Sequence, residues 1–129
     1  MFTSNATLNI GSQDLTNGKA LSMFKTLTNN GLTINETSIT VANSGTYLVT
    51  YYVNKATSAA GTDGISLAIN NVVNNNTACP LSESSTSSGQ FVMTLTAGDS
   101  ISLVPVILNA KRLEASGGPS VTLTVVRIY

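Results

Sequence analysis

The stretch Gly45-Thr46-Tyr47-Leu48-Val49-Thr50-Tyr51-Tyr52-Val53 decides the fold class of this chain. A turn glycine opens a run of aromatic and β-branched residues in which apolar side chains alternate with period two, the pattern of a β-strand. Both parities carry apolar groups: Tyr47, Val49, Tyr51 and Val53 on one, Leu48 and Tyr52 on the other. One face therefore packs in the domain core, and we expect a second layer or another subunit to cover the other.

Turn signals recur along the rest of the chain, and no segment shows the 3.6-residue period of a helix. The strongest hairpin signals are Asn30-Gly31 and Asn70-Asn71, because both pairs tolerate the left-handed conformations of a type I′ turn. Further strands are expected at Thr7 to Ile10, Ala20 to Leu27, Ser38 to Val41, Ile65 to Ile69, Gln90 to Thr96, Ser100 to Leu108 and Val121 to Tyr129.

Proline, glycine and polar segments elsewhere in the chain indicate sheet edges, loops and turns between the predicted strands. Pro105 cannot donate a ladder hydrogen bond, so it predicts a sheet edge or a bulge. The segments Asn54 to Asp63 and Ser82 to Gln90 are polar enough to form exposed loops, and Gly117-Gly118-Pro119 predicts a turn. Many short antiparallel strands in 129 residues predict one domain over residues 1–129, an all-β, antiparallel two-sheet jelly-roll sandwich.

Charge and hydropathy exclude several classes of partner. Charged residues make up 9% of the chain against roughly 25% in a typical soluble protein, and the formal net charge is zero. No basic patch is available for phosphate groups, so nucleic acid is not an expected partner. The longest apolar run, Leu103 to Leu108, falls far short of the roughly 18 residues of a membrane-spanning helix, so we expect no membrane insertion.

The inventory of reactive side chains argues against an enzyme. The chain has no His and one Cys, Cys79, so the commonest general base, an internal disulfide and CxxC metal sites are all lacking. Its six carboxylates are scattered, and Asp63 would serve a metal only if the fold brought other ligands to it. A hydroxyl without a base is a poor nucleophile. We therefore expect no catalytic residue, no cofactor and no metal.

The run Gly45-x-Tyr47-x-Val49-x-Tyr51 resembles the Gly-x-Tyr-x-Phe-x-aromatic signature of complement-type globular heads, which belong with the tumour necrosis factor jelly rolls. Leu32 and Ile39 stand where that signature has large apolar groups. The resemblance implies that the parity of Tyr47, Val49 and Tyr51 points between the sheets. It leaves Leu48, Thr50 and Tyr52 for neighbouring subunits, so these three are the expected trimer-interface residues.

A closer resemblance, from about Leu32 to the end, is to the C-terminal domain of BclA-type collagen-like spore-surface glycoproteins. It runs through Gly45-Thr46-Tyr47, the hairpin Leu67 to Val72, the strand Phe91 to Leu95 leading into Thr96-Ala97-Gly98-Asp99, and the terminal Ser120 to Val126. The resemblance implies a non-enzymatic, homotrimeric head on the spore surface (exosporium), at the tip of a collagen-like stalk and with a role in adhesion. No Gly-x-y repeat occurs in this sequence, so localisation rests on the resemblance.

A second reading places the chain among lectin-like or receptor-binding trimeric heads, such as fibre tips or secreted cytokine-like modules, with host surfaces or glycans as partners. Asn70 to Thr77 offers the amides of a sugar site without its aromatic residues. Tyr47, Tyr51 and Tyr52 could stack on sugars, but we expect the first two in the core.

Overall fold

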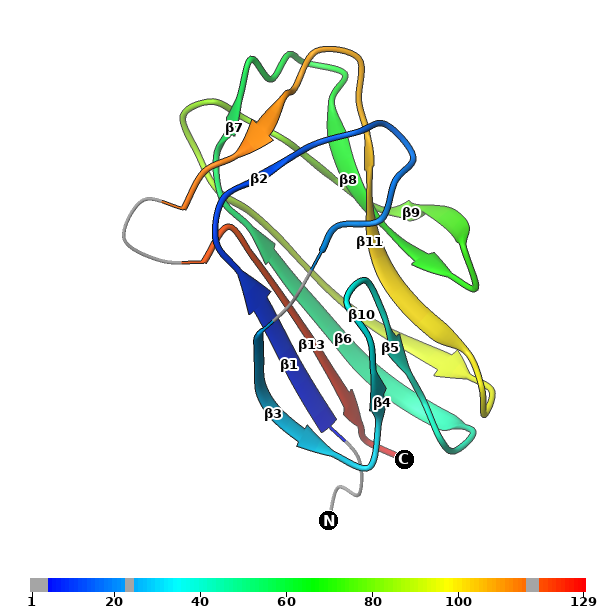
Figure 1. Cartoon of the computed structure of the whole chain (residues 1–129). Coiled ribbons are helices and arrows are strands. Elements are labelled where there is room, and N and C mark those ends of the chain that lie inside the picture. Colours follow the sequence, from blue (N-terminus) through cyan, green and yellow to red (C-terminus); the bar gives the residue numbers. More distant parts are fainter. Residues whose placement is uncertain (1–4, 23–24, 116–118) are drawn as a thin grey trace.

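The computed structural model describes residues 5–22, 25–115 and 119–129, and every element in them is a β-strand. Two five-stranded sheets stack face to face as a jelly-roll sandwich, which confirms the predicted fold class (Figure 1). All strand pairs are antiparallel. The expected turn at Gly117-Gly118 lies outside the described residues.

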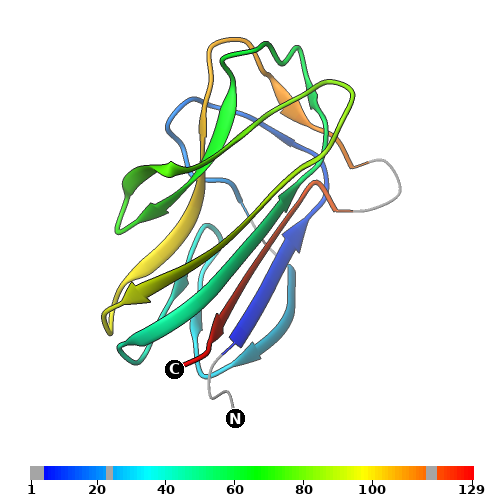
Figure 2. The same ribbon diagram turned by 180° about the vertical axis from the view of Figure 1, so that it is seen from behind.

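One sheet has the strand order β10 (Ser87–Leu95), β6 (Gly45–Val53), β13 (Val121–Arg127), β1 (Asn5–Ile10) and β3 (Lys25–Asn30), seen side by side in Figure 2. The other has the order β4 (Thr33–Ile34), β5 (Ile39–Thr40), β11 (Ser100–Val106), β8 (Gly64–Ile69) and β9 (Val72–Pro80). A small third sheet joins β2 (Gln13–Asp14), β12 (Arg112–Leu113) and β7 (Ala56–Thr57).

Strand β6, which the sequence predicts to be central, is an inner strand of its sheet between β10 and β13. Its inward side chains Tyr47, Val49, Tyr51 and Val53 are 0–2% exposed. The hydroxyl of Tyr51 crosses the core and donates to the carbonyl of Thr77 in β9 at 2.6 Å. Burial raises the pKa of Tyr51, and the neighbouring Cys79 raises it further. Tyr51 therefore remains a neutral hydrogen-bond donor that links the two sheets.

A glycine makes room for the Tyr51 ring on the adjacent strand. Gly89 of β10 is the register partner of Tyr51, and a Cβ there would lie 2.8 Å from the tyrosine ring and 2.6 Å from the ring of Phe91. The two rings stack with centroids 6.1 Å apart.

The end of the chain closes onto the start of β6. Thr46 donates its backbone N–H to the carbonyl of Tyr129 at 3.1 Å, and Ile128 donates to the carbonyl of Thr46 at 2.9 Å. A Cβ on Gly45 would lie 2.5 Å from the Tyr129 carbonyl oxygen and 2.7 Å from Nε of Arg127. Gly45, which the sequence presents as a turn residue, is therefore needed because the C-terminal segment passes so closely.

Several boundaries differ from the sequence expectations. Asn70-Asn71 does form the hairpin between β8 and β9, with φ of 52° and 67°. Asn30-Gly31 is not a hairpin, because it connects β3 in one sheet to β4 in the other. Residues 20–22 lie outside any strand, and the strand expected at Ala20 to Leu27 begins only at Lys25. Conversely, β10 begins at Ser87, inside the segment Ser82 to Gln90 expected to be a loop, and β7 lies inside the other expected loop, Asn54 to Asp63.

Pro105 lies within β11, which is an inner strand of its sheet. Its partner β5 pairs only with Ser100 and Ile101, so beyond that point one side of β11 faces a loop. The carbonyl of Pro105 accepts the N–H of Gly18 from this loop at 2.9 Å. The N and the carbonyl of one strand residue point the same way, so the missing donor of Pro105 faces the loop and breaks no ladder bond. The strand is a local edge there, as the proline predicts.

Asp63 fastens two loops at one end of the sandwich. Its buried carboxylate accepts four backbone N–H groups, from Ala60 at 3.0 Å, Leu108 at 2.7 Å, Asn109 at 3.2 Å and Ala110 at 2.8 Å. Burial by itself raises the pKa of Asp63, but these hydrogen bonds outweigh it and hold the pKa below its ordinary value of 3.8. Asp63 thus has a structural role and all its acceptor capacity is used.

We expect Gly45→Ala to destabilise the fold by about 1–3 kcal/mol, because the methyl group must displace backbone at the C-terminal closure. Gly61→Ala is the matched control, since a Cβ there meets nothing within 4 Å. Urea unfolding of both variants measures the difference. Equal midpoints would contradict the close approach at Gly45.

We also expect Asp63 to contribute stability that acid removes. A group whose folded pKa is lowered stabilises the fold above its unfolded pKa, near 3.8, and that contribution is lost as the pH falls through the folded pKa. Thermal melting between about pH 2 and 6 should therefore show an acid limb that Asp63→Asn reduces. Asp63→Ala should cost about 2–4 kcal/mol at neutral pH, because buried N–H groups lose their acceptor.

The control is Asp14→Asn, because the Asp14 side chain is 85% exposed and its 3.5 Å ion pair with Arg112 contributes little. An acid limb unchanged in Asp63→Asn would refute the assignment.

Candidate assembly face

The outward surface of β6 and its two neighbours carries no charged side chain, and we call it the outer face. The strand register places its side chains in three rows across β10, β6 and β13. These rows are Val92–Leu48–Val126, Gln90–Thr50–Thr124 and Ser88–Tyr52–Thr122. None of the nine residues is charged.

The outer face combines an apolar row with a polar hollow. Leu48 and Val126 are half-buried, and Val92 is 64% exposed. Ile128 and Tyr129, 50% and 90% exposed, follow β13 at the same end of the sheet. The other two rows line a hollow of about 370 Å³ whose walls are hydroxyls, the Gln90 amide and the Tyr52 ring. Solvent-facing sheet surfaces usually carry charges that keep molecules apart, and this one does not.

The structure places all three predicted interface residues on this face. Leu48, Thr50 and Tyr52 are half-buried and have the opposite parity to the core residues of β6. Sequence reasoning missed the six residues of β10 and β13 that complete the rows. Their alternation marked the strands, but only the register shows which residue lies beside which.

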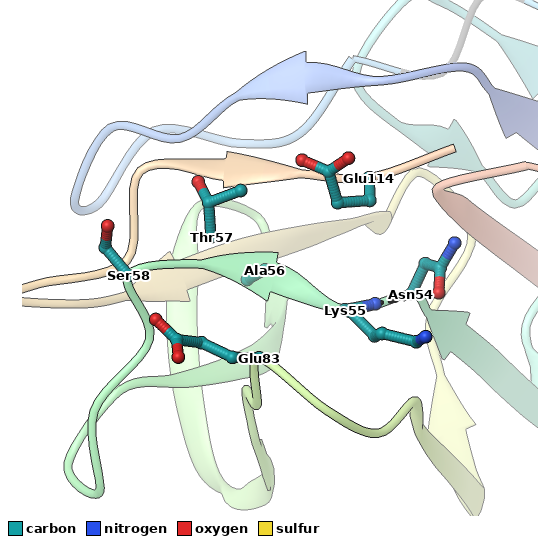
Figure 3. Close-up of a pocket in the computed structure, with 7 residues that line it drawn as sticks. All are labelled: Asn54, Lys55, Ala56, Thr57, Ser58, Glu83 and Glu114. Carbon is teal, nitrogen blue, oxygen red and sulfur yellow. Dashed lines mark hydrogen bonds between the residues drawn. The ribbon is translucent and has the colours of Figure 1, made fainter. Parts of the chain in front are cut away.

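A second concave site lies around β7, at the other end of the sandwich from the C-terminus (Figures 1 and 3). This end pocket has a volume of about 340 Å³, and Figure 3 shows its two carboxylates, Glu83 and Glu114, on opposite sides of β7. The backbone sets this arrangement. Glu114 donates its N–H to the carbonyl of Lys55 at 2.9 Å, and Ala56 donates to the carbonyl of Ser82 at 2.8 Å on the other side of β7.

The end pocket has the polar groups of a site for a small hydrophilic molecule. It offers the ammonium group of Lys55, the two carboxylates and the hydroxyls of Thr57 and Ser58. Ser58 has φ of +61°, a conformation rare for a residue with a side chain. Asn54 is 8% exposed and uses its Oδ1 to accept the N–H of Lys55 at 2.8 Å.

The other sequence candidates have structural roles. In the amide-rich segment, Thr77 is buried and its hydroxyl accepts the N–H of Leu67 at 2.8 Å. Asn74, Asn75 and Asn76 are exposed beside Val72 and Val73, along a shallow groove. Cys79 is half-buried and its thiol donates to the carbonyl of Ser88 at 3.1 Å. Tyr47 and Tyr51 are core residues, as expected, and Tyr52 faces outward.

Within residues 5–22, 25–115 and 119–129, no three His, Cys, Asp or Glu side chains come together as a potential metal site. In the same part of the chain, no helix has the length and hydropathy needed to cross a bilayer.

Solved structures with the same architecture share little sequence with this chain. Eiger TNF from S. frugiperda superposes with a TM-score of 0.74 at 13% identity, covering 99% of this chain and 93% of the other. Murine APRIL at pH 8.5 gives 0.73 at 20% identity, covering 97% and 98%. The globular domain of zebrafish complement 1qA gives 0.64 at 13% identity, covering 98% of both chains. These likenesses establish the fold.

No curated protein gives a significant match to the chain. A family profile does: the BclA C-terminal domain matches residues 2–129, nearly the whole sequence. The match agrees with the motifs from Gly45-Thr46-Tyr47 through the terminal strand, and with the jelly-roll fold in which they lie. The chain therefore belongs to the BclA C-terminal domain family.

Proposed function

We propose that this chain is a non-enzymatic, homotrimeric head at the C-terminus of a collagen-like spore-surface glycoprotein, exposed at the tip of the outer spore layer, the exosporium. The observation that carries the proposal is the uncharged outer face of β6, with its apolar row, in a member of the BclA C-terminal domain family. Family membership supports the location. The outer face supports self-association, because burying it costs no desolvation of charge.

A three-fold assembly requires two different surfaces on each copy, since a cyclic trimer forms head-to-tail contacts. The outer face is one of them. The second is the open edge of the sandwich at β10, which is the last strand of its sheet. Phe91 and Met93 point inward there but stay half-exposed, whereas the inward residues of β6 are 0–2% exposed. A neighbouring outer face would cover these two side chains.

The orientation of the chain fits a head on a stalk. Strand β1 starts at Asn5, whose register partner is Val126 near the end of β13, so the first described residue lies at the same end as the C-terminus. Figure 2 shows the small third sheet at the opposite end. A stalk attached before β1 would leave the loops around that sheet, including the end pocket, facing the environment.

A charge introduced on the outer face of β6 should prevent assembly, whereas a charge introduced on its core face should prevent folding. Leu48→Glu places the carboxylate where it is desolvated only on assembly, so we expect a folded protein of lower molar mass. Val49→Glu buries the charge within the subunit at a cost of several kcal/mol and should prevent folding. Sedimentation of the wild type should give three times the 13.3 kDa chain mass.

The matched control is Leu108→Glu, because Leu108 is 84% exposed and lies outside the outer face. It should assemble like the wild type. A monomeric wild type, or a Leu48→Glu protein that remains trimeric, would exclude assembly through this face.

The end pocket favours a second candidate function, a lectin-like or receptor-binding head that takes hydroxylated ligands such as host-surface glycans. Sugars need donors and acceptors set close together, and the pocket offers an ammonium group, two carboxylates and two hydroxyls within one concavity.

We expect binding to an immobilised oligosaccharide panel to be lost in the Glu83→Gln, Glu114→Gln double variant. Glu36→Gln is the control, since Glu36 is exposed and outside the pocket. Binding by none of the panel, or unchanged binding by the double variant, would reject this function.

A further inference from the structure

Three acidic or amide residues in this chain precede a glycine: Asn17-Gly18, Asn30-Gly31 and Asp63-Gly64. Such a pair can modify itself without an enzyme. The glycine main-chain nitrogen attacks the side-chain carbonyl carbon, and the absence of a Cβ on glycine leaves its approach open. The attack needs a side chain and an N–H group that are both free to reach the reacting geometry. The fold therefore decides which of the three pairs can react.

Asn17-Gly18 is held at both reacting groups. The side-chain oxygen of Asn17 accepts the N–H of Ile107 at 2.9 Å. The N–H of Gly18 donates to the carbonyl of Pro105 at 2.9 Å. Rotation of the carboxamide toward the glycine nitrogen would break the bond to Ile107, and attack by that nitrogen would break the bond to Pro105, so this pair is protected.

Asp63-Gly64 is held more firmly. The Asp63 carboxylate is buried and accepts four backbone N–H groups. Gly64 is the first residue of β8 and pairs with Pro80 of β9. Neither the Asp63 carboxylate nor the Gly64 main chain can reorient unless the bonded loops and the start of β8 open together.

Asn30-Gly31 is different. Asn30 is exposed and ends β3, the outermost strand of its sheet. The turn is closed by the preceding residue, Asn29, which donates its Nδ2 to the carbonyl of Leu32 at 3.0 Å and accepts the N–H of Leu32 at 3.1 Å. Among the described residues, neither the Asn30 carboxamide nor the N–H of Gly31 has a hydrogen-bond partner. Gly31 has φ of +79° and lies outside any strand.

We propose that Asn30 is a self-modification site of the folded protein, where it deamidates while Asn17 is protected. The nitrogen of Gly31 bonds to Cγ of Asn30, ammonia leaves, and a five-membered cyclic imide forms. One water molecule then opens the ring. Opening at Cγ gives aspartate, and opening at the main-chain carbonyl gives isoaspartate, in which the chain runs through Cγ. The reaction requires no oxidant, reductant or enzyme.

The product changes both the charge and the edge of the sheet. The chain has a formal net charge of zero and a pI near 6.1, so one new carboxylate gives a distinct acidic species. Isoaspartate also adds a carbon to the main chain at the residue whose register partner is Asn5, at the start of β1. The modification would therefore act at the end of the head where β1 begins.

The test is timed peptide mapping of the purified, folded protein incubated at mildly alkaline pH, with isoelectric focusing in parallel. We expect Asn30 to convert about tenfold or more faster than Asn17. In urea, where neither pair is held, the two rates should converge. Asn30→Gln should abolish the acidic species, and Asn17→Gln should leave its formation unchanged.

Conversion of Asn17 as fast as Asn30 in the folded protein would overturn the proposal. So would an Asn30 that stays intact when folded but converts in urea, because the fold would then protect it too. Neither outcome bears on trimer assembly, so this test and the sedimentation test fail independently.

Discussion

The fold depends on the burial of one face of β6 between two sheets. Tyr47, Val49, Tyr51 and Val53 fill the middle of the sandwich, and each buried side chain of this size contributes about 1.5–3 kcal/mol. Tyr51 also carries the polar link between the layers, because its hydroxyl reaches the carbonyl of Thr77. Gly89 provides the space for that ring, so a small residue on one strand fits a large residue on the next.

Because β6 commits one parity to the core, its other parity has to meet something else. That constraint connects the fold to the proposed trimer. The outer face has hydroxyls, one amide and three aliphatic side chains where many solvated sheets carry Lys and Glu. By contrast, five of the chain's twelve charged residues lie on or directly beside the small third sheet, at the end around the pocket: Asp14, Lys55, Lys111, Arg112 and Glu114. The distribution of charge thus separates a surface suited to assembly from one suited to solvent or ligand.

Because charged residues are scarce, a few polar side chains hold the loops and turns through hydrogen bonds to the backbone. The Asp63 carboxylate accepts backbone N–H groups of two loops, and the Asn17 amide oxygen accepts the N–H of the distant Ile107. The Asn29 amide closes a turn by bonding to Leu32. In a chain with so many amides, hydrogen bonding decides which side chains are fixed. Asn30, which closes nothing, is left available for chemistry.

The sequence by itself determined the all-β class and the long apolar strand Gly45 to Val53, because period-two alternation depends only on local geometry. Both parities of that strand carry apolar groups, so the prediction of which parity fills the core came from the resemblance to complement-type globular heads. The sequence also placed the Asn70-Asn71 hairpin, since left-handed φ values at a tight turn are a local preference. Only the tertiary structure decided that Asn30-Gly31 crosses between sheets, that Asp63 is a loop clamp, and that Val92 and Val126 flank Leu48. Those facts depend on which distant strands pair and in which register, and nothing in a local pattern specifies the partner.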